Sequence, residues 1–130
     1  MNVNFFEEPQ SVPKGREEVR LRQIGLFVYE DLRRVAVGLE LTPFLERPCI
    51  ELTITNSQGM RSASLTLIET HTPNITLVMH LRDTLVPKAD YTLTAQIYYD
   101  HPELTQRQVY HTDTLHFKLT AGEQIFPLAA

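Results

Sequence analysis

The middle of the chain alternates between apolar and polar residues with a period of two rather than 3.6. From position 35 to 41, for example, valines and leucines alternate with Ala36, Gly38 and Glu40. Successive side chains of a strand point to opposite sides, so this period predicts β-strands that bury one face. The alternation places strands at about 35–41, 50–55, 63–67, 75–81, 91–99 and 115–119.

A seventh predicted strand, at about 19–28, changes parity between Leu21 and Ile24, which indicates a β-bulge. Turn sequences such as Asn56-Ser57-Gln58-Gly59 separate the runs. Short strands with turns at this spacing predict an all-β fold, a seven-stranded antiparallel β-sandwich spanning 19–120. We interpret 1–18 as an N-terminal arm or linker and 121–130 as a C-terminal tail. Apolar residues in both leave open that either docks on the domain or on a partner.

Composition narrows the class of protein. The 130 residues are 42% hydrophobic and 22% charged, which is typical of a soluble globular domain. A net charge of -4 disfavours a nucleic-acid binder. The single cysteine, Cys49, excludes an intrachain disulfide and fits a reducing compartment. The chain has neither a signal-like N-terminus nor an apolar run of membrane-spanning length, so we expect a cytoplasmic protein without membrane insertion.

The segment Pro87-Lys88-Ala89-Asp90-Tyr91-Thr92-Leu93-Thr94-Ala95 carries a resemblance. It resembles the stretch that opens the sixth strand in many bacterial immunoglobulin-like and fibronectin type III-like modules. The resemblance covers about 19–120 and implies that Tyr91 forms a tyrosine corner, hydrogen-bonding backward across the connection. The chain departs from antibody domains because the positions facing each other hold Val37 or Leu39 and Leu93 instead of cysteines. It therefore resembles a disulfide-free sandwich, a fold that implies no particular chemistry.

Metal ligands are sparse in this pattern. In a strand, His111 and Asp113 project to one face and His116 to the other, so the run supplies at most two converging ligands, with His101 or Asp100 as a possible third. Carboxylate side chains in the loops could hold Ca²⁺. They flank opposite ends of one predicted strand, however, and roles in turns explain their presence without a metal. These acids are Asp83, Asp90, Asp100 and Glu103. We expect no metal and no cofactor.

The sequence also contains none of the catalytic motifs considered. The sequence lacks a Gly-x-Ser-x-Gly elbow, a phosphate-binding glycine loop and a His-Glu-x-x-His motif. Cys49 follows Pro48 at the start of a predicted strand, where a half-buried thiol is an ordinary packing choice. We therefore predict that the protein is not an enzyme.

One surface stands out by its lack of charge. If the third, sixth and seventh strands share a sheet, its outward side is almost purely threonine, tyrosine and glutamine apart from Glu51. The opposite sheet, with Arg20, Arg22, Arg34, Glu40 and Arg82, is expected to be ordinary solvated surface. Tyrosine is enriched at interfaces. The predicted binding residues are Thr94, Gln96, Tyr98, Tyr110, Thr112 and His116, with Phe44 in the loop 43–48 as a second anchor.

These observations predict a non-enzymatic protein-interaction or structural module whose partner is a second copy or another protein. Threonine is also simply favoured in strands, so an inert surface is the competing interpretation. The alternative from another class is a small-ligand module that binds carbohydrate through the tyrosines or calcium through the loop acids. The absence of tryptophan weakens the carbohydrate alternative.

Overall fold

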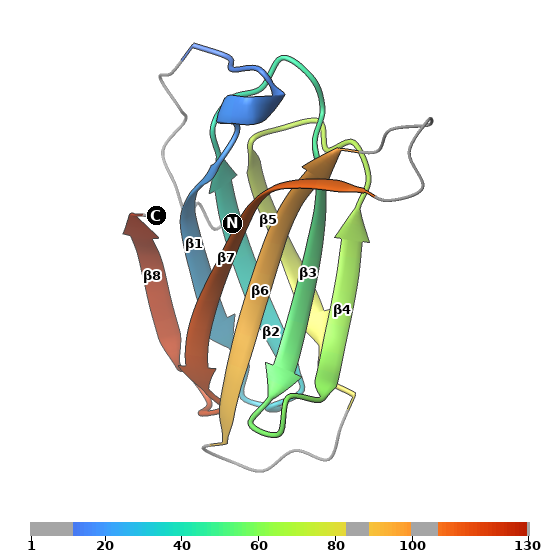
Figure 1. The fold of residues 1–130 in the computed structure, drawn as a ribbon. Helices are drawn as coiled ribbons and strands as arrows, with labels where there is room; N and C mark the ends of the chain where they lie inside the picture. Colours follow the sequence, from blue (N-terminus) through green and yellow to red (C-terminus); the bar gives the residue numbers. More distant parts are fainter. Residues whose placement is uncertain (1–11, 83–88, 100–106, 130) are drawn as a thin grey trace.

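The computed structural model describes residues 12–82, 89–99 and 107–129. In these ranges two four-stranded antiparallel sheets face each other, and a single 3-10 turn, η1 (Arg16–Glu18), lies at one end (Figure 1). The prediction of an all-β antiparallel sandwich is confirmed. With one cysteine in the chain, packing rather than a disulfide holds the sheets together.

One sheet has the strand order β5-β2-β1-β8 and the other the order β4-β3-β6-β7. The first consists of β1 (Leu21–Val28), β2 (Arg34–Leu41), β5 (Asn74–His80) and β8 (Gln124–Ala129). The second consists of β3 (Cys49–Asn56), β4 (Arg61–Leu67), β6 (Asp90–Tyr99) and β7 (Gln108–Lys118). The third, sixth and seventh strands therefore share a sheet, as predicted, and β4 extends it.

The eighth strand comes from the segment that we interpreted as a C-terminal tail. β8 pairs with β1, with Leu128 opposite Ile24, so the predicted number of seven strands was wrong and the sandwich extends past residue 120. Pro127 lies inside this short run and cannot donate a backbone hydrogen bond, which disfavours a strand assignment from sequence. An edge strand tolerates such a proline because one side of its backbone needs no partner.

The apolar positions of the alternating runs meet between the sheets. Their side chains are fully buried at, among others, Leu26, Leu39, Leu52, Ile54, Leu93 and Ile97. The predicted bulge in the first strand is confirmed by a register shift between Leu21 and Gln23. The predicted turn at 56–59 also forms, with Gly59 at φ +77° and its N–H donating to the Asn56 carbonyl.

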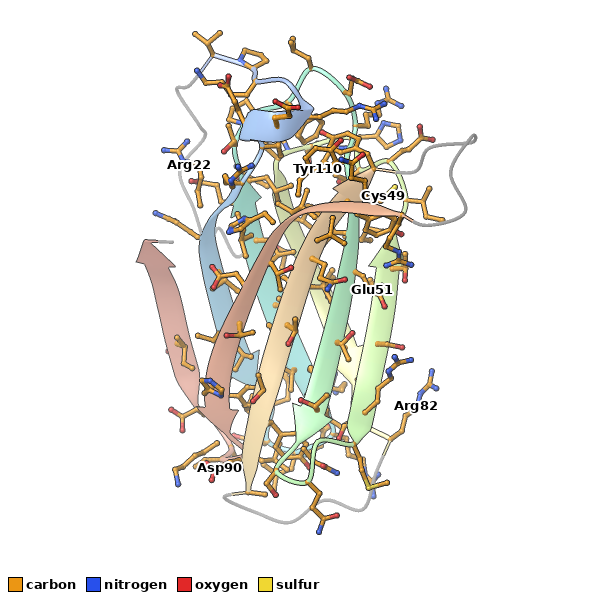
Figure 2. All side chains as sticks on the ribbon, in the orientation of Figure 1. Arg22, Cys49, Glu51, Arg82, Asp90 and Tyr110 are labelled. Atoms are coloured by element: carbon orange, nitrogen blue, oxygen red, sulfur yellow. The ribbon has the colours of Figure 1, made fainter. Side chains whose placement is uncertain are left out.

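Strand β2 departs from the expected alternation, because seven of its eight residues are buried. The outward residues Ala36 and Glu40 are only 8% and 6% exposed. The expectation of ordinary solvated surface was therefore wrong at Glu40. It holds for the four arginines predicted there, which are exposed, and Figure 2 labels two of them, Arg22 and Arg82.

Part of the predicted arm belongs to the sandwich. The Lys14 N–H donates to the Pro43 carbonyl at 2.8 Å, and the Leu45 N–H donates to the Lys14 carbonyl at 2.9 Å. This pairing ties 12–18 to the β2–β3 connection at the end of the sandwich that also carries η1, which we call the loop end (Figure 1). Residues 1–11 lie outside the described part. None of the helical segments in the described ranges is long and apolar enough to cross a membrane.

Candidate functional site

The outward side of the β4-β3-β6-β7 sheet is the candidate site, and we call it the threonine face. Its residues are Glu51, Thr53 and Thr55 of β3, Ser64 and Thr66 of β4, Thr92, Thr94, Gln96 and Tyr98 of β6, and Val109, Thr112, Thr114 and His116 of β7. The parity of each strand puts them on one side, because their neighbours Leu52, Leu93 and Leu115 face the core. This arrangement follows from the alternation in the sequence.

The face is built from rows that cross the sheet. Thr53, Thr94 and Thr114 lie opposite one another on adjacent strands, and Ser64 extends this row onto β4. Paired threonines stabilise adjacent strands through methyl contacts and hydroxyl hydrogen bonds. The β7 member, Thr114, is exposed and the two central threonines are half-buried, so the row offers hydroxyl groups to a partner.

The next rows on either side carry the remaining polar candidates. Gln96 lies between Glu51 and Thr112, and Thr92 lies opposite His116. The hydroxyl of Thr92 and Nδ1 of His116 are 3.0 Å apart, so the imidazole is held across the two strands. Of the predicted binding residues, Thr94, Gln96, Thr112 and His116 thus share this face.

Tyr98 is on the threonine face, but its ring is covered. The residue is only 3% exposed, and the guanidinium carbon of Arg107 lies 4.0 Å from the ring centroid. Arg107 also forms an ion pair with Glu51, so the cation is fixed above the ring and the charge of Glu51 is balanced. The expectation of an exposed Tyr98 was therefore wrong, because a long side chain from outside the strand caps it.

Tyr110 does not join the face at all. The β6–β7 register shifts between Ile97 and Tyr98, so Val109 rather than Tyr110 lies opposite Tyr98. Tyr110 instead packs edge-on against Tyr99, with ring centroids 5.4 Å apart. A bulge reverses the parity of a strand beyond it, and for this reason the outward placement of Tyr110 was wrong.

Apolar side chains border the face at the loop end. Val109 is 42% exposed beside Tyr98, and Ile68 is 69% exposed next to the buried Cys49, which lies opposite Tyr98. Phe44, the second predicted anchor, is half-buried and packs against the core, whereas the adjacent Leu45 is 72% exposed. Figure 2 shows Cys49 and Tyr110 near the loop end and Glu51 lower on the sheet.

A cavity of about 550 Å³ opens at the loop end. Its lining residues are Arg16, Glu46, Arg47, Cys49, Ile68, Glu69 and Tyr99. Arg16 donates through Nε and a terminal nitrogen to the Glu46 carboxylate at 2.8 and 2.6 Å, and its guanidinium lies 4.8 Å from the Tyr99 ring centroid. Sequence reasoning missed this cluster, since Arg16 belongs to a segment without periodicity.

The residues that line this cavity form a packed hydrogen-bond network. The Tyr99 hydroxyl donates to the Glu46 carbonyl at 2.8 Å. Burial, followed by the negative charge of Glu46, raises the pKa of Tyr99 to about 12, so its hydroxyl stays protonated. Hydrogen bonding to Glu46 raises the pKa of Arg16. Cys49 accepts a hydrogen bond from the Glu69 N–H at 3.5 Å and is 3% exposed, which is a packing environment.

The proposed metal ligands do not converge within the described residues, which contain no group of three or more potential ligands. His111 turns inward, where its Nδ1 accepts a hydrogen bond from the Leu21 N–H at 2.8 Å, and His116 is on the opposite side. Asp90 pairs with Lys118 at 3.6 Å. The other candidate ligands, Asp83, Asp100, His101 and Glu103, lie outside the described residues.

Burial lowers the pKa of His111, and Arg20 acts in the same direction while Asp113 opposes it. The neutral imidazole is the form that accepts the hydrogen bond from the Leu21 N–H, so this bond joins the edge of β7 to β1 across the two sheets.

Tyr91, the predicted tyrosine corner, is 3% exposed and its ring lies 5.7 Å from that of Phe117. The backward hydrogen bond of its hydroxyl stays a prediction.

No known protein family model matches the chain, and no curated protein resembles it in sequence. Similar folds occur among solved structures. A β-glucuronidase from Bifidobacterium dentium, solved with coumarin-3-O-glucuronide, matches 77% of this chain with a TM-score of 0.59 and 12% identity. A β-glucuronidase from Parabacteroides merdae matches 78% with a TM-score of 0.57 and 17% identity. The matched regions are 18% and 14% of those enzymes, so the likeness shows a shared sandwich fold alone.

Proposed function

We propose that the protein is a non-enzymatic interaction module that binds another protein chain through the threonine face. The observation that carries this proposal is the pairing of charge on the face: Glu51 pairs with Arg107 near the loop end and Asp90 pairs with Lys118 at the other end, while Arg61 lies at the β4 edge opposite Thr55. The centre of the face loses little solvation energy when it is covered, because Thr53, Thr94 and Gln96 are uncharged and Glu51 is already paired.

The loop end of the face supplies the apolar part of an interface. Ile68 and Val109 are exposed on either side of the row that contains Cys49 and the capped Tyr98. Depletion of charge, with tyrosine and arginine at the centre, is typical of protein interfaces. A partner that covers this row would bury the two aliphatic side chains together with the flat side of the arginine.

The fold supports the same role. We propose that the sandwich is of the fibronectin type III kind, because the strands equivalent to C, F and G share one sheet, with β4 beside them. In the glucuronidases the matching domain is a small part of a much longer chain. A sandwich that forms one small part of a longer chain elsewhere is compatible with a module that binds.

The partner that we favour is a second copy of this chain, because a neutral face is compatible with itself in a two-fold contact. Light scattering behind size exclusion over a wide concentration range should show a dimer of about twice 15.0 kDa at high concentration. The double variant Ile68→Glu with Val109→Glu should remain monomeric, because it introduces like charges at both borders. Met60→Glu is the matched control, since Met60 is 61% exposed at the opposite end.

The control should dimerise like the unaltered chain. A wild-type chain that stays monomeric at every concentration would overturn the self-association, and a double variant that dimerises normally would show that another surface is used. Melting curves of all three proteins establish that the variants are folded.

A second candidate is carbohydrate binding, favoured by the hydroxyl and amide groups of the Thr53, Thr94 and Gln96 rows. The glucuronidases that share the fold act on sugar conjugates, as their names state. The capped ring of Tyr98 weighs against stacking on a sugar. Calorimetric titration with neutral oligosaccharides and a glucuronide would give measurable heats for this candidate and none for the protein-binding module.

A further inference from the structure

The two open sides of the sandwich are built differently. The edge strands are β7 and β8 on one side and β4 and β5 on the other (Figure 1). On the β7 side the inward side chains Leu115 and Phe117 are buried, and the bond from Leu21 to His111 joins the sheets. On the other side four inward side chains remain partly exposed, and we call them the β4–β5 seam. They are Leu65 and Leu67 of β4 and Ile75 and Leu77 of β5.

The backbone edge of β5 is the least protected of the four edges. Within the described ranges β2 is its one neighbouring strand, and their pairing runs without a register shift. The other edge strands are interrupted, β8 by Pro127, β7 by the extra residue Tyr110 and β4 by the extra residue Ser62. Bulges, prolines and charged residues keep foreign strands from pairing with an edge. Strand β5 has none of them, since Asn74–His80 contains no proline, lysine, arginine or acidic residue.

Charged side chains lie at the two ends of the seam. Arg82 follows β5, and its N–H donates to the Ser62 carbonyl at 2.9 Å, next to Arg61 at the start of β4. Figure 2 shows Arg82 beside this end of β4. At the loop end, Glu69 lies just beyond β4. All three side chains are exposed, and none has an ion pair within the described part of the chain. A ligand with an acidic end and a basic end would complement this distribution of charge.

We propose that the β4–β5 seam binds an extended segment of another protein, which adds a strand to the free edge of β5. Every second side chain of the segment is apolar and packs on the seam. An acidic residue of the segment lies near Arg61 and Arg82, and a basic residue lies near Glu69. Main-chain hydrogen bonds supply the affinity of such strand addition, and the contacts of alternate side chains supply its specificity. The seam is separate from the threonine face, so this inference goes beyond the proposed function.

The spacing of the seam defines the segment that fits. Leu65 and Leu67, like Ile75 and Leu77, are two residues apart on one strand, so an added strand meets them with the same period of two. The seven residues of β5 extend over about 23 Å. A segment of about seven residues with charged ends therefore spans the seam from Glu69 to the arginines.

Peptide titration of the full ¹⁵N-labelled chain tests the site. The probe is acetyl-Glu-Val-Thr-Val-Thr-Val-Lys-amide, and the control peptide has serine in place of each valine. We expect the valine peptide to shift the amide resonances of Leu67, Ile75 and Leu77, and the serine peptide to leave them in place. Resonances of Thr94 and Thr112 should not move with either peptide, so the result does not depend on the threonine face.

A charge reversal tests the orientation of the bound segment. Arg61→Glu should weaken the valine peptide about fivefold or more, because an attraction becomes a repulsion. A peptide with lysine in place of its glutamate should regain the lost affinity for this variant. Lys118→Glu is the matched control, since it makes the same change of charge on an exposed side chain of β7. This control should bind the valine peptide like the unaltered chain, and melting curves establish that both variants are folded.

Three results would overturn the proposal. Absence of shifts on β5 with the valine peptide would show that the edge does not accept a strand. Equal shifts with both peptides would show that the apolar seam is not recognised. Shifts at Thr94 and Thr112 in place of Ile75 and Leu77 would assign the peptide to the threonine face.

Discussion

The two outer faces of the sandwich are made of similar strands but relate to water in opposite ways. On the threonine face, the central side chains Thr94 and Gln96 are half-buried and the β7 side chains are exposed. On the outer side of the β5-β2-β1-β8 sheet, Ala36 and Glu40 are buried although they hold equivalent outward positions. Small side chains at Ala36 and Gly38 contribute to the difference, but the burial of the larger Glu40 shows that side-chain size is only part of it.

The two faces also differ in how their charged side chains are paired and exposed. Glu51 on the threonine face is balanced by Arg107, which reaches the face from the position just before β7. Glu40, on the outer side of β2, has Nε of Arg22 3.8 Å from its carboxylate and is nearly inaccessible. A surface that holds its charges paired and accessible is suited to a reversible partner, whereas the carboxylate of Glu40 is already withdrawn from water.

The largest expected effect comes from adding the same charge to each face. Ala36→Asp places a carboxylate without a partner at a buried position and should lower the free energy of unfolding by about 3 kcal/mol or more. Thr94→Asp on the threonine face should cost about 1 kcal/mol or less, mostly through β propensity. Urea denaturation measures the change in the free energy of unfolding for both variants. Equal losses would mean that the two faces are not different in burial.

A smaller effect is expected from uncovering Tyr98. Arg107→Ala removes a cation–π contact and an ion pair and should cost about 1 kcal/mol. Because the chain has no tryptophan, tyrosine fluorescence can be read directly, and quenching by acrylamide should increase. Arg82→Ala is the control, since Arg82 is exposed and the described residues give it no ion pair. If both variants behave alike, Arg107 does not cap the ring.

The smallest effect concerns His111, which links the sheets that carry the two faces. Its folded-state pKa is lowered, so the unfolded chain binds the proton more readily. The stabilisation is complete above the unfolded pKa of about 6.5 and is lost as pH falls through that value toward the folded pKa. His111→Gln should remove this loss, because glutamine accepts the Leu21 N–H without titrating. Melting temperatures of the unaltered protein and the variant from pH 8 to 5 test this prediction. Identical pH profiles of the two proteins would assign the pH dependence of stability to other groups.

The alternation of residues was sufficient to predict the strands, the two-sheet sandwich and the bulge in β1, because each is a direct consequence of which side chains must be buried. It could not reveal the bulge at Tyr110 of β7, since the stretch 108–114 has no apolar alternation that would fix its parity. It missed β8 because Pro127 interrupts a short run. It missed the cap on Tyr98 because Arg107 lies outside any strand pattern.

The burial of β2 escaped prediction for a related reason. Ala36, Gly38 and Glu40 read as the solvent side of an amphipathic strand, and nothing in their spacing shows that they are buried. Local periodicity reports which residues share a side, whereas burial also depends on residues far away in sequence.

The central claim is that the threonine face is the surface that binds a partner chain. Amide spectra of the ¹⁵N-labelled full chain over a dilution series test it most directly, because they locate the contact residue by residue. We predict concentration-dependent shifts at Thr94, Gln96 and Thr112 and at the borders Ile68 and Val109, with Thr76 and His80 of β5 unchanged. Shifts confined to the β5 side, or a spectrum that does not change while the mass doubles, would contradict the account.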